Sequence, residues 1–202
     1  MAQRRPRGEL RIIGGTWRSR RIRFADTEVR PTPDRVRQTT FDWLAPRIRG
    51  ARVLDLCAGS GAMGLEALSR GATEAVFVDA GRAQITAIQA ALELLQAGAR
   101  AVAVQQDALQ WLRGASGRKP FDIAFVDPPY AAGLWARLLP SLADCMAMDH
   151  RLYIEWPRAE EPEFGVALQW HRTSRAAAVS YGLASFADGT QPDVEGGTAC
   201  PE

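Results

Sequence analysis

Short apolar runs alternate with longer amphipathic segments over residues 52–156, and this alternation restricts the fold more than any other feature of the chain. The runs have the length of buried strands, while apolar residues such as Ile85, Ile88 and Leu92 recur at helical spacing. The pattern predicts an α/β fold, with a mostly parallel sheet and helices on both of its faces. We predict strands at 52–56, 74–79, 101–105, 121–126 and 151–156, and helices at 62–70, 82–96, 108–113 and 134–147.

Further segments flank this region at both ends. Residues 11–15 and 21–24 predict a small hairpin, and Thr32-Pro33-Asp34 predicts the start of a helix. The segments 164–171 and 176–186 predict a second hairpin that closes the sheet. The last residues are polar and rich in glycine, a composition typical of disorder. We therefore expect an N-terminal extension at 1–50, an α/β domain at 51–186 and a disordered tail at 187–202.

Length and composition exclude several classes of protein. The 202 residues are enough for one α/β domain, and an apolar fraction of 47% is too high for a disordered chain. No apolar run approaches the roughly 20 residues of a membrane helix, and no signal-peptide pattern opens the chain. The cysteines have no paired spacing and the histidines form no ligand motif, so we predict no metal and a reducing, cytoplasmic location. These residues are Cys57, Cys145, Cys200, His150 and His171.

Basic residues are concentrated at the start of the chain. The net charge is only +2, but residues 1–50 hold 13 of the 25 basic and 5 of the 23 acidic residues. This balance of +8 leaves −6 for the remainder, and such segregation predicts a surface that binds nucleic acid. Lys119 is the only lysine, so genomic base composition is an alternative source of the arginines. That bias would not collect them in one segment.

A glycine-rich loop joins the first predicted strand of the sheet to its helix. Gly59, Gly61 and Gly64 form the pattern G-x-G-x-x-G, which permits a tight turn and close approach of a ligand to the backbone. Asp79 ends the next strand, where a carboxylate can accept hydrogen bonds from ribose hydroxyls. A dinucleotide, S-adenosylmethionine and a purely structural turn all fit this pattern. Asp55 favours S-adenosylmethionine, because a carboxylate there can face an ammonium group but would repel a pyrophosphate.

A second motif follows the strand at 121–126. Neither proline of Asp127-Pro128-Pro129-Tyr130 can donate a backbone hydrogen bond, so the strand must end there. Carbonyl and carboxylate acceptors beside a flat ring suit a planar base that carries an exocyclic amine. A simple strand-ending turn is the alternative. Both motifs end parallel strands and so lie at one edge of the sheet. A dehydrogenase usually needs a second domain, which the sequence does not supply. A methyltransferase needs only a methyl donor and an acceptor held side by side.

Together these segments resemble the RsmD-type 16S ribosomal RNA guanine-N2 methyltransferases over about residues 10–186. The resemblance implies a Rossmann-like class I S-adenosylmethionine-dependent fold, a mostly parallel seven-stranded sheet whose last strand is antiparallel. It also implies methylation of the guanine called 966 in small-subunit maturation. Four segments carry the resemblance, of which the first two are more specific than the last two, because many amino-methyltransferases share the last two. The segments are RIIGGTWR at 11–18, RPTPDRVR at 30–37 with Phe41, LDLCAGSG at 54–61 and FVDPPY at 125–130.

The chemistry and the resemblance assign roles to individual residues. The predicted catalytic residues are Asp127 and Pro128, whose oxygens would hold the amine, and Tyr130, whose ring would stack on the base. The predicted cofactor ligands are Asp55, Ala58, Gly59, Gly61, Asp79 and Asp107, the last also a candidate helix N-cap. Gly81 stands where relatives often carry a charged residue, which makes Asp79 the safer ribose ligand.

The predicted RNA contacts are arginines of the basic N-terminal segment. Arg35 and Arg37 cannot share a helical face, so we expect at least one of them to contact the protein body. Trp17 is predicted to pack rather than stack on a base. The full set of predicted RNA contacts is Arg18, Arg20, Arg21, Arg30, Arg35 and Arg37.

Two other functions remain open at this point. A DNA adenine-N6 methyltransferase also acts on an exocyclic amine, although such enzymes usually have a larger target-recognition region. A non-catalytic RNA-binding assembly factor would keep the fold but be free to lose the motifs. The expected partner is 16S rRNA, either in the 30S subunit or in an assembly intermediate.

Overall fold

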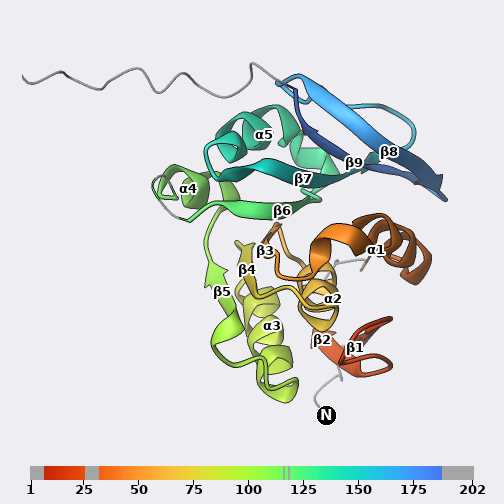
Figure 1. Ribbon diagram of the computed structural model, residues 1–202, viewed down its shortest axis with the longest axis vertical. Coiled ribbons are helices and arrows are strands. Elements are labelled where there is room, and N and C mark those ends of the chain that lie inside the picture. The colour runs from red at the N-terminus through yellow and green to blue at the C-terminus, as the bar shows by residue number, and fades with distance from the viewer. Residues whose placement is uncertain (1–6, 26–31, 116, 118, 188–202) are drawn as a thin grey trace, which may run out of the picture.

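A seven-stranded sheet forms the centre of the computed structural model, which describes residues 7–25, 32–115, 117 and 119–187 (Figure 1). The strand order is β5-β4-β3-β6-β7-β9-β8. The first five strands of this order are parallel, and β9 runs antiparallel to both of its neighbours, as predicted. The strands are β3 (Arg52–Leu56), β4 (Glu74–Asp79), β5 (Ala101–Gln105), β6 (Phe121–Val126), β7 (Met146–Pro157), β8 (Leu168–Ala176) and β9 (Val179–Phe186).

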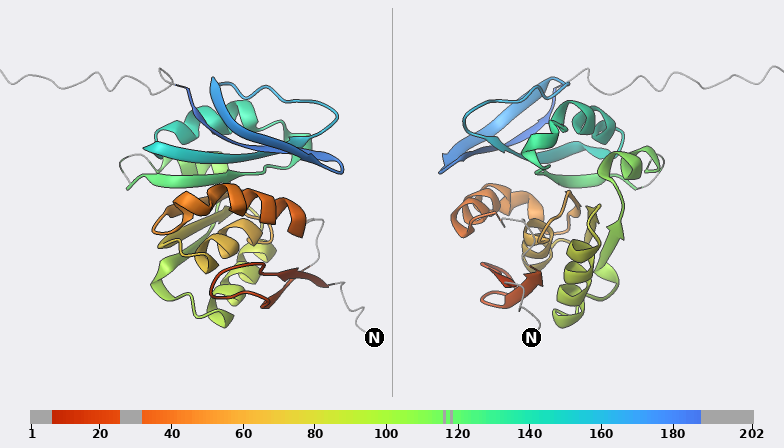
Figure 2. Two further views of the ribbon diagram at one scale, coloured as in Figure 1. Left: turned by 45° about the vertical axis from the view of Figure 1, so that its right-hand side comes forward. Right: turned by 180° about the vertical axis from the view of Figure 1, so that it is seen from behind.

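Helices cover both faces of the sheet, and the alternation of side chains along each strand explains how (Figures 1 and 2). In β3, Val53 packs with one set of helices, while Leu54 and Leu56 pack with the other. The first set comprises α1 (Asp34–Ile48), α2 (Ala62–Ser69) and α3 (Arg82–Leu94); the second comprises α4 (Ala108–Arg113) and α5 (Trp135–Ala143). Two short 3₁₀ turns, η1 (Gly98–Arg100) and η2 (Tyr130–Ala132), complete the elements.

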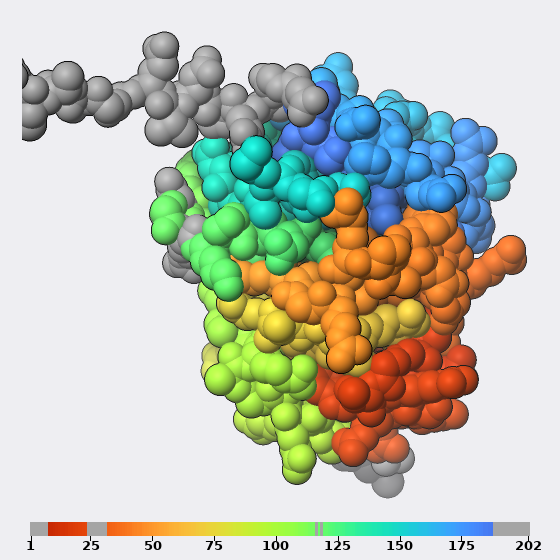
Figure 3. All heavy atoms as spheres, in the orientation of Figure 1, coloured from red at the N-terminus to blue at the C-terminus, as the bar shows by residue number. Residues whose placement is uncertain are grey.

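The N-terminal extension contributes to the main core. β1 (Arg7–Arg11) and β2 (Arg21–Ala25) form the predicted antiparallel hairpin. Leu10, Ile12 and Ile22 are buried in the same apolar cluster as residues of α2 and α3. Figure 3 shows the hairpin and α1 next to each other on one side of the molecule. The division at residue 50 therefore separates sequence features rather than cores. Of the tail predicted at 187–202, only Ala187 belongs to the described residues.

Several boundaries differ from the sequence prediction. The strand expected at 11–15 lies at Arg7–Arg11, and the strand expected at 164–171 lies at Leu168–Ala176. The helix expected at 134–147 ends at Ala143, and the strand expected to begin at 151 already begins at Met146. The cause is the start of β6, because the Phe121 N–H donates to the Cys145 carbonyl (2.8 Å) and Phe121 pairs with Met146. Tertiary pairing thus extends this strand at the expense of the helix.

Candidate functional site

The ends of four parallel strands bring the predicted site residues together. Leu56 of β3 pairs with Val78 of β4 and with Val126 of β6, and Val126 pairs in turn with Ile154 of β7. Neighbouring strands lie about 4.8 Å apart, so the residues that follow these pairs form one compact row. The row holds Cys57, Asp79, Asp127 and Glu155 at the carboxyl edge of the sheet.

The glycine loop takes the tight, left-handed path that its sequence predicts. Gly59 and Gly61 have φ angles of 53° and 73°, a region that side chains rarely permit. Gly64 serves packing, since a Cβ there would lie 2.3 Å from Cε1 of Phe77. The Ala58 N–H donates to the Val78 carbonyl (2.9 Å), which ties the loop to β4. The loop therefore brings backbone close to the sheet edge, where a ligand can approach it.

Asp55 supports this loop from beneath. Its side chain is buried, and Oδ2 accepts a hydrogen bond from the Gly64 N–H (2.9 Å). Gly61, the N-cap of α2, has no side chain, so Asp55 satisfies an amide of the first helical turn in its place. Burial, together with the charge of Asp79, raises the pKa of Asp55 to about 7. The carboxyl group is thus poised to change charge near neutrality when a cation approaches it.

The two other predicted cofactor carboxylates differ in exposure. Asp79 is half-buried and accepts hydrogen bonds from the Gly59 and Gly81 N–H groups, at 2.8 and 2.7 Å. Each of its oxygens has a further lone pair for a ribose hydroxyl. Asp107 is exposed and accepts from the Gln110 N–H (3.0 Å), which confirms its predicted role as the N-cap of α4.

The tip of β6 presents an acid and an aromatic ring. Asp127 is half-buried and accepts no hydrogen bond from the described residues. Burial, followed by the charges of Glu155 and Asp55, raises the pKa of Asp127 well above its ordinary value. Tyr130 is 37% exposed, and its ring lies 5.9 Å from that of Trp135 at an angle of 31°. A strand-ending turn would need neither the unpartnered carboxylate nor the exposed ring.

Glu155 is a residue of this site that the sequence reasoning missed. It is buried near the end of β7 and accepts hydrogen bonds from the Tyr130 hydroxyl (2.8 Å) and the Tyr153 hydroxyl (2.6 Å). The signal in the sequence was an acid within the otherwise apolar run at 152–156, at the same edge as the other motifs. A charged residue is rarely buried there without a partner or a function.

The site has a negative character that limits its chemistry. No ion pair with a basic side chain is found for Asp55, Asp127 or Glu155 in the described part of the chain. Such a set of carboxylates suits a ligand with positive charge. Burial and four neighbouring carboxylates raise the pKa of the Cys57 thiol to about 12, so this cysteine is not an activated nucleophile.

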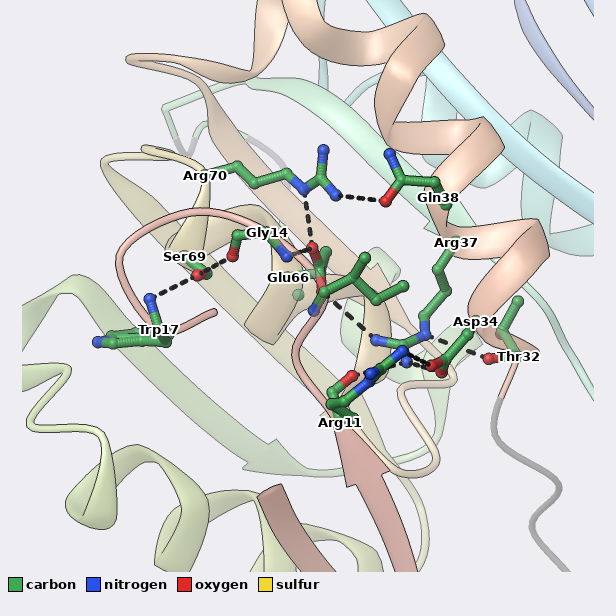
Figure 4. A network of polar contacts seen from close by, with 12 residues as sticks. Arg11, Gly14, Trp17, Thr32, Asp34, Arg37, Gln38, Glu66, Ser69 and Arg70 are labelled. Carbon is green, nitrogen blue, oxygen red and sulfur yellow. Dashed lines mark hydrogen bonds and ion pairs between the residues drawn. The ribbon is translucent and has the colours of Figure 1, made fainter. Parts of the chain in front are cut away.

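Figure 4 shows a network that fastens the N-terminal extension to α2. The carboxylate of Glu66 accepts hydrogen bonds from the Ile13 and Gly14 N–H groups, both at 2.8 Å. Arg37 and Arg70 reach the same carboxylate, at 3.4 and 2.7 Å. Residues 11–18 and 32–37, the described parts of the two most specific segments of the resemblance, therefore meet on the helix that follows the glycine loop.

A close approach of backbones explains the paired glycines at this junction. A Cβ on Gly15 would lie 1.8 Å from the Ser69 carbonyl oxygen, and Gly15 has a φ angle of 76°. Ser69 also accepts from the Trp17 N–H (2.9 Å) and donates to the Gly14 carbonyl (2.5 Å). The Ser69 hydroxyl thus joins the end of α2 to the backbone of the loop before β2, at a separation that only glycine permits at position 15.

The structure contradicts the predicted RNA contact of Arg37. Its side chain is fully buried and donates to the carbonyls of Thr32 (3.2 Å) and Arg11 (2.8 Å). Ion pairs with Asp34 (2.6 Å) and Glu66 complete its contacts. Of the two arginines that cannot share a helical face, Arg37 is thus the one that contacts the body.

The other arginines of the basic segment differ in their surroundings. Arg18 and Arg35 are exposed. Arg20 donates to the Leu94 carbonyl (3.2 Å) and Arg21 pairs with Glu9 (2.5 Å), and both remain exposed. Arg30 lies outside the described residues. These positions leave four of the six predicted RNA contacts on the surface.

Trp17 packs inside the protein, and the described residues contain neither a membrane-spanning helix nor a metal-binding group. Trp17 is buried, and the guanidinium carbon of Arg100 lies 5.3 Å from its ring, which confirms that it packs. Across the described ranges, no helix is long and apolar enough to cross a membrane. The same residues contain no group of three or more histidine, cysteine, aspartate or glutamate side chains that could hold a metal ion.

Comparisons with known proteins agree with this arrangement. A family model described as Conserved hypothetical protein 95 matches residues 10–184. The Ribosomal RNA small subunit methyltransferase D of Escherichia coli K12 is 42% identical over 184 residues, which cover 87% of this chain and 89% of that protein.

Two solved structures share the fold. A structure described as a putative methyltransferase, yhhF, from E. coli has a TM-score of 0.78 and 40% identity, and covers 88% of this chain and 97% of its own. A T. thermophilus 16S rRNA N2 G1207 methyltransferase, solved with AdoMet and guanosine, has a TM-score of 0.66 and covers 90% of this chain and 50% of its own. Its identity of 21% shows the shared fold alone.

Proposed function

The chain belongs to the family described as Conserved hypothetical protein 95, and we propose that it methylates the exocyclic N2 of a guanine in 16S ribosomal RNA. It is an rRNA methyltransferase that uses S-adenosylmethionine. The observation that carries the proposal is Asp127, a carboxylate without a hydrogen-bond partner among the described residues, beside the exposed ring of Tyr130. Both residues follow β6, which pairs with the strand that precedes the glycine loop.

The residues present fit this cofactor. The left-handed turns at Gly59 and Gly61 bring backbone to the ligand, and Asp79 offers acceptors for a ribose. Asp55 and Asp127 supply negative charge without a basic partner in the described ranges, which suits the sulfonium and ammonium groups. Asp107, beyond β5, is the proposed acceptor for the adenine amine, and Ala58 the proposed backbone contact.

The chemistry requires positioning more than a strong base. When bound, S-adenosylmethionine supplies an electrophilic methyl group whose bond to sulfur breaks, with the electron pair left on sulfur. Asp127 and the Pro128 carbonyl accept hydrogen bonds from the two N–H groups of N2. These bonds direct the nitrogen lone pair away from the ring plane. Asp127 takes the proton that methylated N2 must lose, and Tyr130 stacks on the base. Such positioning is worth about 7–11 kcal/mol, to which the charge of Asp127 adds.

The finer assignments also belong to this proposal. The resemblance to the RsmD-type enzymes supports guanine 966 as the target and the 30S subunit or an assembly intermediate as the substrate. The exposed Arg18, Arg20, Arg21 and Arg35 are the proposed phosphate contacts, in the cytoplasm where the ribosome is assembled. No observation favours the DNA adenine-N6 methyltransferase or the non-catalytic assembly factor.

A methylation assay with labelled cofactor tests the proposal. Unmodified 30S particles, free 16S rRNA and duplex DNA are offered in parallel, and the products are digested and separated as nucleosides. We expect label in N2-methylguanosine from 16S rRNA, and its formation about 100-fold slower or more when Asp127→Ala replaces the wild type. Label in N6-methyladenine from DNA, or cofactor binding without transfer to any substrate, would overturn the proposed function.

A further inference from the structure

Glu155 lies beside Asp127 and Tyr130, the two residues that are proposed to hold the target base. Its carboxylate accepts hydrogen bonds from the Tyr130 hydroxyl (2.8 Å) and the Tyr153 hydroxyl (2.6 Å). Its backbone carbonyl accepts from Nε1 of Trp135 (3.1 Å), whose ring faces that of Tyr130. One residue of β7 thus accepts hydrogen bonds from three aromatic side chains, while its own side chain is only 5% exposed.

Glu155 is also a neighbour of Asp127 across two adjacent strands. Val126 pairs with Ile154, so Asp127 and Glu155 are the next residues on adjacent parallel strands, about 4.8 Å apart along the sheet. Phe125 and Tyr153, two residues earlier, belong to the same apolar cluster, which places both acids on the face covered by α1 and α2. The two negative charges therefore influence each other directly.

We infer that Glu155 is a positioning residue for methyl transfer, which holds the Tyr130 ring over the target base and sets a second carboxylate beside Asp127. The inference rests on the proposed function and adds a residue to it. Glu155 acts through its two neighbours and needs no contact with the base. Because its side chain is buried, its carboxylate is directed at these partners rather than at solvent.

A purely structural role for Glu155 makes a different prediction. Tyr153 is buried, and a carboxylate that merely satisfied its hydroxyl would affect folding and nothing else. Tyr130, in contrast, is partly exposed and needs no buried partner, yet it donates to the same carboxylate. The contact holds an exposed ring in one orientation, which is useful to a ligand-binding site and unnecessary for stability.

The pH dependence of the reaction separates the two roles. Asp127 is faced by Asp55 from β3 and by Glu155 from β7, and its charge also acts on Cys57, Tyr130 and Tyr153. Burial and these two carboxylates raise the pKa of Asp127, so removal of the Glu155 charge lowers it. The acid limb of the single-turnover rate should therefore move to lower pH in Glu155→Gln.

The experiment measures single-turnover methylation of 16S rRNA against pH for wild type, Glu155→Gln and Glu93→Gln. Glu93 is an exposed residue of α3, so its substitution removes the same charge outside the site. We expect a displaced acid limb and a rate lower by about 10-fold only in Glu155→Gln, with cofactor affinity unchanged within about 2-fold. An unaltered acid limb in a folded Glu155→Gln would overturn the inference.

Tyr130→Phe keeps the test decisive if Glu155→Gln fails to fold. It removes one hydrogen bond from a partly exposed side chain and leaves the charge of Glu155 in place. We expect a rate lower by about 3-fold to 10-fold with the acid limb where it is in the wild type. A wild-type rate in this variant would overturn the positioning of the ring. Failure of the wild-type enzyme itself to methylate 16S rRNA would instead reject the proposed function.

Discussion

Asp55→Asn should stabilise the protein, and increasingly so as the pH rises. Burial raises the pKa of Asp55 from its ordinary 3.8 to about 7, so the folded state binds this proton more tightly than the unfolded state. The stability that such a group contributes is lost as the pH rises from its pKa in the unfolded state through its pKa in the folded state. Three pKa units correspond to about 4 kcal/mol. The ionised, buried carboxylate should lower the free energy of unfolding by this amount at about pH 8.

Asparagine removes this titration but keeps the oxygen that accepts from the Gly64 N–H. Linkage predicts that the difference in free energy of unfolding between Asp55→Asn and wild type grows by about 2–3 kcal/mol from about pH 5 to about pH 8. Urea unfolding at both values measures it, because groups common to both proteins cancel. Exposed Asp144→Asn is the matched control and should show a difference that does not change with pH.

The same substitution should weaken cofactor binding. Loss of a charge beside the ammonium group predicts a decrease of about 10-fold in affinity, measured by calorimetry at about pH 8. A difference in stability that is flat with pH would refute the reasoning, because it would mean that Asp55 is ionised at no cost in the folded protein. The measured stability would then not support a cation-binding role for Asp55.

Three further outcomes follow from the contacts of the site and the extension. Asp79→Ala should weaken cofactor binding by about 1–3 kcal/mol in calorimetry, and tight NAD binding without S-adenosylmethionine binding would reject the assignment. Combined neutralisation of Arg18, Arg20 and Arg21 should lower RNA affinity and flatten its dependence on salt; an unchanged salt slope would place the RNA surface elsewhere. Arg37→Ala should lower the free energy of unfolding by about 3 kcal/mol, since it leaves buried acceptors without a partner; a loss below about 1 kcal/mol would contradict its structural role.

Much of the fold could be predicted because local pattern and tertiary structure agree. Alternating strands and helices and the glycine loop appear where the periodicity and turn residues place them, and the closing hairpin appears with its first strand displaced to Leu168–Ala176. The start of β7 at Met146 could not be predicted, because it depends on pairing with Phe121, twenty-five residues away in the sequence. Local propensity contains no information about such a partner.

The site shows the same limit in another form. Asp127 and Tyr130 could be found because prolines mark the end of their strand. Glu155 has no such marker, and its importance depends on two hydroxyl groups that only the fold brings to it. Arg37 was misassigned because a basic residue in a basic segment does not reveal that Glu66, on another helix, lies within reach. Contacts between distant segments decide both cases.

The single-turnover rate of Asp127→Ala tests the central claim most directly. Asp127 accepts no hydrogen bond from the described residues, and burial raises its pKa, so its removal should not lower the free energy of unfolding by more than about 1 kcal/mol. With cofactor and 30S particles both bound, the account predicts a rate lower by about 100-fold or more, as for the loss of one preorganised polar group. A rate close to that of the wild type would remove this carboxylate from the mechanism and leave the tip of β6 as a strand-ending turn.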